Sequence, residues 1–262
     1  MLGIASGLFN APDPPVIESN PDALSLTGHR SFVNTNSTFQ NIFRNSYTLS
    51  IWFQLNSYVS PQSGSNTVHT LFGTRDGADD EVVLSLNSTG GGKIQFHMEG
   101  ASDNSVTTNT DSADNFADGE WRHIAVTVAN DSETSVIIYV NGAAVDTTNT
   151  TDLGQSNHNN YTNASRLFIG ANSNGGAPED YFYGAIKDPA IWSEALTAAN
   201  IAKVYNNGVP FDLTSNAGDY ENEDTLVAYY RFIENGGTVA EDDGSGDSNG
   251  LIVDATRIDS GL

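Results

Sequence analysis

Residues 181–192 constrain the fold most. They read Tyr-Phe-Tyr-Gly-Ala-Ile-Lys-Asp-Pro-Ala-Ile-Trp, so apolar or aromatic residues occupy both alternating faces. Such a run is typical of a strand that is buried on both sides. Because proline has no N–H to donate to a neighbouring strand, Pro189 predicts a bulge or an edge position there.

A short helix is predicted directly after this strand, over residues 198–205. Thr197 suits the N-cap, because a hydroxyl oxygen accepts a hydrogen bond from the unpaired N–H groups of the first turn. Gly208 lies just beyond the end of the helix, where glycine is common. A buried strand that leads into one short helix indicates a two-sheet sandwich.

Alternating apolar and polar residues recur along most of the chain. The clearest case is residues 47–55, with Leu49, Ile51, Phe53 and Leu55 predicted to face inward. Asn141-Gly142 predicts a two-residue hairpin turn, because both residues tolerate positive φ. Further strands are predicted at residues 67–72, 82–86, 93–98, 120–128, 136–140, 143–145, 166–170 and 225–232. Long polar loops are expected at residues 146–164 and 171–180. Many short strands separated by turns predict an all-β sandwich.

The same strand and helix carry a family resemblance. The pattern is Phe182-x-Gly184-x-Ile186-x-Asp188-x-x-Ile191-Trp192, followed by Ala195-Leu196-Thr197 and Ile201. It resembles the closing motif of laminin-G-like and pentraxin-like domains in the concanavalin A-like lectin/glucanase superfamily. The resemblance implies an all-β fold, an antiparallel two-sheet jelly roll with one short helix, over residues 23–262. Residues 225–232 are expected to return to this sandwich rather than to begin a second domain.

Charge and cysteine content exclude several classes of function. The chain has 33 acidic and 10 basic residues, a formal charge of −23, and no cysteine. Nucleic acids and anionic membranes attract basic patches, so neither is expected as a partner. No stretch is long and apolar enough for membrane insertion. The acidic residues fit a solvated surface or, where they cluster, calcium ligands.

Residues 1–22 are expected to form an extended N-terminal arm. They contain four prolines and few periodic apolar positions. We expect the arm to bind other virion proteins, the alternative being a loosely packed terminus. The opening residues lack the positive segment of a secretion signal, which fits a virion protein released by lysis, or else a mature chain.

An acidic segment and two later loops predict a calcium site. Asp79-Asp80-Glu81 resembles the Asp-Asn-Glu run of pentraxins, in which the first two residues bind calcium. The resemblance therefore implies Asp79 and Asp80 as ligands. It also implies Asn172 and Asn174, where pentraxins use Glu and Asp, and Glu179 or Asp180 as a later acidic ligand. Amides carry no charge, so we expect at most one site of lower affinity.

Aromatic residues beside the long loops predict sugar contacts. Tyr161, Tyr181 and Tyr183 are the stacking candidates, because the C–H face of a sugar needs an apolar surface. The tryptophans are assigned to the core or the sheet faces. None of the five histidines has a second histidine at a metal-ligand spacing, so we expect His123 to be a packed strand residue.

Catalytic motifs are absent from the sequence. Glucanases of the superfamily carry Glu-x-Asp-x-x-Glu on one strand, and the chain has no such pattern. It also lacks a nucleophile elbow and a phosphate-binding glycine loop. We therefore expect a protein that is not an enzyme.

Two functions follow from these observations. The first is a structural or adhesive component of a bacteriophage virion, because residues 225–250 resemble laminin-G-like modules of phage structural proteins. The second is a secreted or surface lectin that binds carbohydrate with calcium. Both permit binding of host-surface glycans, and edge strands make a homo-oligomer plausible. Deletion of residues 1–22 separates the two, because only the first requires the arm for particle incorporation.

Overall fold

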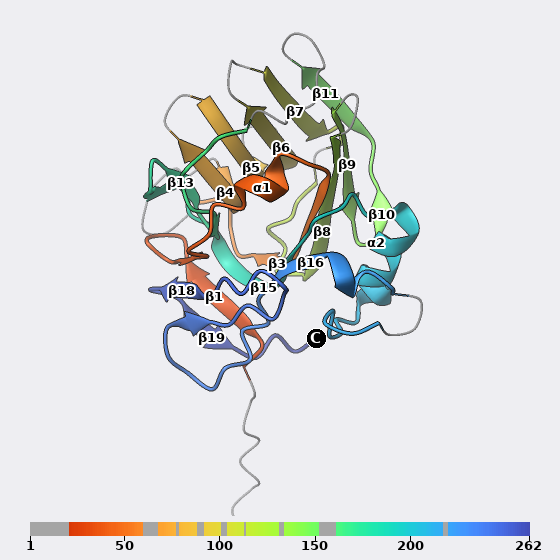
Figure 1. The fold of residues 1–262 in the computed structure, drawn as a ribbon. Helices are drawn as coiled ribbons and strands as arrows, with labels where there is room; N and C mark the ends of the chain where they lie inside the picture. The colour runs from red at the N-terminus through yellow and green to blue at the C-terminus, as the bar shows by residue number, and fades with distance from the viewer. Residues whose placement is uncertain are drawn as a thin grey trace, which may run out of the picture.

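The computed structural model describes residues 21–59, 68–76, 79–87, 92–100, 104–112, 114–130, 134–151, 161–216 and 220–262. In these residues two sheets form a sandwich, and all pairings are antiparallel except a bridge between Asn174 and Arg75 (Figure 1). The all-β, two-sheet prediction is confirmed. No described helix is long and apolar enough to cross a membrane.

Sheet A contains the strand predicted at residues 181–192, which lies in the interior of the sheet. In spatial order its strands are β10 (Ala143–Ala144), β9 (Thr134–Val140), β8 (Arg122–Asn130), β3 (Tyr47–Leu55), β15 (Tyr183–Trp192), β1 (Ala23–Thr27) and β19 (Thr256–Ile258), with β16 (Leu226–Tyr229) also paired to β15.

Sheet B is the larger sheet. In spatial order its strands are β11 (Thr147–Thr151), β7 (Asn104–Thr110), β6 (Lys93–Gly100), β5 (Asp79–Asn87), β4 (Val68–Asp76), β12 (Phe168–Ile169), β2 (Phe32–Asn34), β18 (Gly250–Val253) and β17 (Val239–Ala240). The hairpin of β13 (Asn172–Asn174) and β14 (Ala177–Glu179) joins the sheet through β4.

β15 is buried on both faces, as predicted, with only Tyr183 partly exposed. Its pairing with β3 shifts register between Lys187 and Ala190, and Asp188 has a φ of 50°. The predicted bulge is therefore present. Pro189 donates no hydrogen bond, but its carbonyl accepts one from the N–H of Tyr230 at 3.1 Å, which ties the C-terminal segment to the bulge.

The alternation of apolar residues places the core between the sheets. The four residues of β3 predicted to face inward, Leu49, Ile51, Phe53 and Leu55, are all fully buried. The predicted hairpin is also confirmed, because Asn141 and Gly142 both have positive φ and link β9 to β10. The C-terminal segment returns to the sandwich as expected, with β16 on β15, β18 on β2 and β19 on β1.

Helix α2 (Ala198–Tyr205) begins at Thr197, whose hydroxyl accepts a hydrogen bond from the N–H of Asn200 as predicted. It covers the outer face of sheet A, where Ile201 and Val204 pack in one cluster with Trp192 and Tyr139. A second helix, α1 (Gln40–Phe43), is a single turn that the sequence did not indicate. Three-residue 3-10 turns occupy Asn206–Gly208 and Glu223–Thr225.

Two predicted loops contain strands. Residues 147–151 form β11 on β7, and residues 172–179 form the β13–β14 hairpin. Both segments are polar, and their pairing depends on a neighbouring strand rather than on their own apolar pattern. The prediction of uninterrupted loops was wrong for these residues.

Most of the expected arm, residues 1–20, lies outside the described residues. Asp22, its last residue, is bound to the sandwich. Its N–H donates to the carbonyl of Ile258, and its carboxylate lies 2.7 Å from the Nζ atom of Lys187. Burial opposes ionisation of Asp22, but hydrogen bonds from Lys187 and Ser260 outweigh this and lower its pKa.

Candidate functional site

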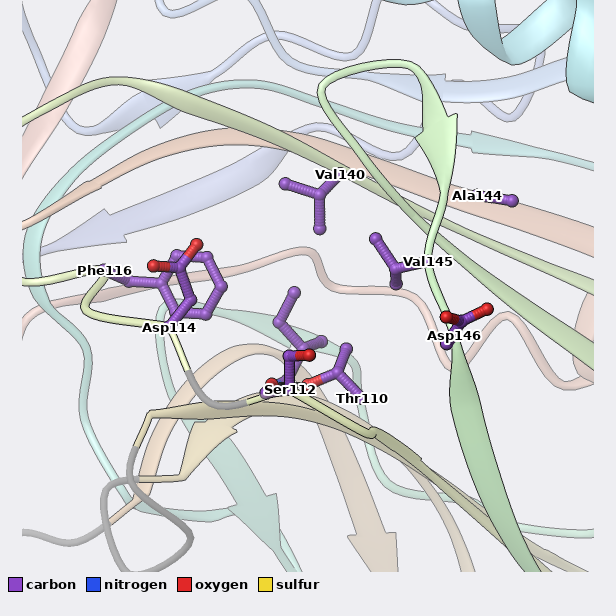
Figure 2. A pocket seen from close by; sticks show the side chains of 9 residues that line it. Thr110, Ser112, Asp114, Phe116, Val140, Ala144, Val145 and Asp146 are labelled. Carbon is purple, nitrogen blue, oxygen red and sulfur yellow. Dashed lines mark hydrogen bonds between the residues drawn. The ribbon is translucent and has the colours of Figure 1, made fainter.

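A pocket of about 340 Å³ opens between the sheets (Figure 2). Strands β6 and β7 of sheet B line one side, and β9 with the segment through β10 lines the other. The lining residues are Ile94, Thr110, Ser112, Asp114, Phe116, Val140, Ala144, Val145 and Asp146. Pockets of this size that combine apolar surface with a few polar groups are typical ligand sites.

The apolar part of the pocket is anchored to the core. The Phe116 ring is 3% exposed and packs edge-on against Phe53, with 5.9 Å between ring centroids. The N–H of Phe116 donates to the Tyr58 hydroxyl at 3.2 Å. Val145 is fixed through its N–H, which donates to the carbonyl of Ile138 at 3.0 Å. These contacts hold Phe116 and Val145 in place before any ligand arrives.

Two carboxylates lie at the rim, on opposite sides of the pocket in Figure 2. The backbones of Asp114 and Asp146 are fixed, because the N–H of Asp114 donates to the carbonyl of Gly92 and the carbonyl of Asp146 accepts from the N–H of Asp111. Both residues are exposed. Within the described part of the chain, neither carboxylate forms a hydrogen bond or an ion pair. The rim therefore offers hydrogen-bond acceptors above an apolar floor.

The residues predicted to bind calcium lie at two places on sheet B. The carboxylate of Asp80 accepts a hydrogen bond from the Thr162 hydroxyl at 2.5 Å, and its carbonyl accepts one from the Asn163 amide at 2.7 Å. Asn163 also binds Thr74, so Asp80 lies toward the Thr74 face of β4. The side chain of Asp79 lies outside the described residues.

The other predicted calcium ligands lie by the β13–β14 hairpin. Asn172 packs over Gly73, on the face of β4 opposite to Thr74. The amide of Asn174 donates to Glu179 at 3.3 Å, and Glu179 lies 3.5 Å from Arg75. Among the described residues, no trio of His, Asp or Glu with converging ligand atoms includes Asp80, Glu179 or Asp180. Burial, followed by the charge of Glu179, raises the pKa of Asp180.

The tyrosines predicted to stack on sugars differ in exposure. Tyr161 is fully buried and packs edge-on against Phe43, with 5.7 Å between ring centroids. Its assignment as a sugar platform is therefore corrected, because the ring fills the core. Tyr181 and Tyr183 are partly exposed. The Tyr181 hydroxyl donates to the carbonyl of Pro178, and its ring packs beside Phe32. Neither tyrosine lines the pocket between the sheets.

His123 is a packed strand residue, as predicted. It is fully buried, its Nε2 atom lies 2.9 Å from the Ser50 hydroxyl, and its ring packs against Trp52. Burial lowers its pKa to about 3, so the ring is neutral at physiological pH.

The pocket residues escaped the sequence interpretation. Asp114 and Asp146 lie in segments without an apolar pattern. Asp146 follows the Asn141-Gly142 hairpin by four residues, and this was the available signal. Residues that follow a hairpin at the edge of one sheet can cross to the other sheet. Only the pairing of β11 with β7 shows that Asp146 lies at this crossing.

Comparisons with known proteins agree with this architecture. A sequence profile of the concanavalin A-like lectin/glucanases superfamily matches residues 27–202. Among solved structures, a Bacteroides ovatus protein proposed to bind carbohydrate is similar with a TM-score of 0.57 and 18% identity, covering 92% of the present chain. The match covers 61% of that protein, so the present chain spans less than two thirds of its length.

Two further solved structures are similar. The CBM40 of Ruminococcus gnavus IT-sialidase bound to α2,3-sialyllactose has a TM-score of 0.53 and 12% identity, covering 70% of the present chain and 97% of that chain. The leech intramolecular trans-sialidase has a TM-score of 0.53 and 12% identity, covering 72% of the present chain and 28% of that chain. At these identities the likeness shows the fold alone. No curated protein matches the chain in sequence.

Proposed function

The chain belongs to the concanavalin A-like lectin/glucanases superfamily, and from this premise we propose that it binds carbohydrate in the pocket between its two sheets without cleaving it. The observation that carries the proposal is the combination of an apolar floor with two exposed carboxylates at the rim. A sugar ring has an apolar C–H face and hydroxyl groups at its edge. Such a ring complements this pocket.

The pocket favours neutral glycans. Its described lining contains two acidic residues, Asp114 and Asp146, and no Lys or Arg. The formal charge of the whole chain is −23. A carboxylated sugar would meet like charges at the rim, and like charges disfavour binding. The solved CBM40 complex contains a sialylated ligand. We therefore expect the present chain to differ from that module in ligand charge.

Replacing Asp114 or Asp146 by asparagine is expected to weaken binding of a neutral oligosaccharide by roughly tenfold, the factor for about 1.4 kcal/mol. Each change replaces an ionised acceptor with a weaker one and preserves side-chain shape. A glycan array identifies the ligand, and isothermal titration calorimetry measures the affinity.

The matched control is Glu241→Gln, which also removes one exposed negative charge but lies outside the pocket. It should bind like the unmodified chain. If all three variants bind equally well, or if the array shows sialylated glycans alone, the pocket assignment is wrong.

Absence of catalysis remains a prediction. The sequence lacks the Glu-x-Asp-x-x-Glu pattern of the superfamily glucanases. Incubation with a bound oligosaccharide should release no reducing ends. Release that depends on Asp114 or Asp146 would make the protein a hydrolase.

Calcium binding by the Asp79–Asp80 segment also remains a proposal. One observation favours an ion there, because the Oδ1 atom of Asp80 is buried and has no hydrogen-bond partner among the described residues. Calcium in tenfold excess over its Kd should raise the melting temperature by roughly 3–5 °C. The double variant Asp79→Ala, Asp80→Ala should abolish this rise.

The two chains are compared by how much calcium raises the melting temperature of each, and not by the melting temperatures themselves. Asp80 itself binds Thr162, so its replacement lowers the melting temperature even without calcium. Glu241→Gln, far from this segment in sequence, should retain the rise. An unmodified chain whose melting temperature is the same with calcium and with a chelator would contradict the proposal.

The bacteriophage setting is a separate proposal. It depends on the sequence of residues 1–22 and on the resemblance of residues 225–250 to modules of phage structural proteins. Residues 1–20 of the arm lie outside the described residues. Particle incorporation of a chain without residues 1–22 tests it. Incorporation at the normal level would refute an anchoring role for the arm.

A further inference from the structure

The outer face of sheet B carries three potential metal ligands. In β6, apolar residues alternate with polar ones, so that Ile94, Phe96 and Met98 are buried in the core. His97 and Glu99 consequently lie on the opposite face. The register of β5 and β6 places Glu81 directly opposite Glu99. Glu81, His97 and Glu99, here called the Glu–His–Glu cluster, share no residue with the pocket between the sheets.

Two distances in the cluster are close to those between the ligands of a tetrahedral metal ion. The Nε2 atom of His97 lies 3.0 Å from Oε1 of Glu81 and 3.4 Å from Oε2 of Glu99. Zinc binds nitrogen and oxygen at about 2.0–2.2 Å, so two donors at a tetrahedral angle are roughly 3.3–3.5 Å apart. All three ligand atoms lie within 4.8 Å of one another.

Groups around the cluster orient its ligands. The Nδ1 atom of His97 lies 2.7 Å from the hydroxyl of Thr107, which stands opposite His97 on β7. When Nδ1–H donates to this hydroxyl, the lone pair of Nε2 faces the two carboxylates. The second oxygen of Glu81 lies 3.4 Å from Nε of Arg75. Metal-binding histidines and carboxylates are commonly fixed through their second polar atom in this way.

Two carboxylates this close to one imidazole nitrogen attract a cation. The ligand side chains are about one-fifth exposed, with 21% for Glu81, 20% for His97 and 17% for Glu99. A metal ion bound between the two carboxylates would neutralise their charge.

We propose that Glu81, His97 and Glu99 bind one divalent transition-metal ion of the zinc type. An imidazole nitrogen with two carboxylates suits Zn²⁺ or Co²⁺, whereas Ca²⁺ takes about 6–8 oxygen ligands. Three protein ligands leave the fourth tetrahedral position to water. The site differs from the predicted calcium site in ligands and in metal class.

The test is calorimetric titration of the chelator-treated full chain with ZnCl₂ at about pH 7.5, in excess CaCl₂. We expect one saturable site per chain that calcium does not block. His97→Gln and Glu99→Gln should each weaken it by roughly tenfold or more, and Thr107→Val by about tenfold. Co²⁺ should give the visible absorption of a tetrahedral ion.

Matched controls separate this site from general attraction of cations to an acidic chain. His29→Gln and Glu120→Gln change the same residue types outside the cluster and should bind zinc normally. Circular dichroism checks that each variant is folded. Thr107→Val retains all three ligands, so it tests the site even if His97→Gln does not fold. Zinc binding that is unsaturable, or that is equal in Thr107→Val, Glu99→Gln and the unmodified chain, would overturn the proposal.

Discussion

Replacing Gly184 by alanine is expected to lower the free energy of unfolding by about 3 kcal/mol. A Cβ atom at this position would lie 2.0 Å from the backbone oxygen of Gln54 and 2.9 Å from the Phe182 ring. The first contact is with the backbone of β3, which pairs with β8 on its other side and has little room to move. Urea or guanidinium denaturation, followed by fluorescence, measures the change.

The control for this prediction is Gly119→Ala. Gly119 has a φ of +79°, and nothing lies within 4 Å of a Cβ atom built there. The free energy of unfolding of this variant should fall only by the cost of placing alanine in the left-handed region, about 1–2 kcal/mol. Equal losses at the two positions would mean that β3 shifts easily. The close approach of β15 to β3 at Gly184 would then contribute little to stability.

Replacing Asp188 by asparagine is expected to make stability less dependent on pH. Desolvation raises the pKa of Asp188 to about 7, although the charge of Lys187 opposes the shift. A native carboxyl with a raised pKa binds protons more tightly than the unfolded one. Its contribution to stability is therefore complete below its unfolded pKa of about 3.9. That contribution is lost as the pH rises toward about 7.

The expected difference is large. Between about pH 5 and pH 8, the free energy of unfolding of the unmodified chain should fall by roughly 2–3 kcal/mol more than that of Asp188→Asn. The reason is that one pKa unit corresponds to about 1.4 kcal/mol. Denaturant unfolding at a series of pH values measures both chains. Glu241→Gln controls for repulsion in a chain of charge −23, which also grows with pH. Parallel pH curves for the unmodified chain and Asp188→Asn would show that Asp188 is ionised when folded.

The Glu81–Glu99 pair differs from the carboxylate pair of a glycosidase. A retaining enzyme needs one carboxyl as nucleophile and another with a raised pKa as acid. Burial would raise the pKa of Glu81, but His97 and Arg75 outweigh this and lower it. His97 also contacts both carboxylates. A lowered pKa is the opposite of what the acid of such an enzyme needs.

In the strand at residues 47–55, sequence alone determined which residues face the core. A strand has a period of two, so alternation in residues 47–55 identified Leu49, Ile51, Phe53 and Leu55, all of which are fully buried. The bulge near Pro189, the hairpin at Asn141-Gly142 and the cap at Thr197 were also predictable. Each depends on a backbone property of one or two adjacent residues, and such properties do not require knowledge of a distant partner.

Only the tertiary structure decided which distant residues meet. Glu81 and Glu99 lie opposite each other because of the β5–β6 register, and Asp114 and Asp146 share a pocket because β11 crosses to pair with β7. A search for histidine pairs missed His97, because its partners are carboxylates from two strands. Tyr161, in a polar segment, fills the core instead of facing a ligand. Register and sheet packing depend on the summed burial of the whole sandwich, and no local segment encodes that sum.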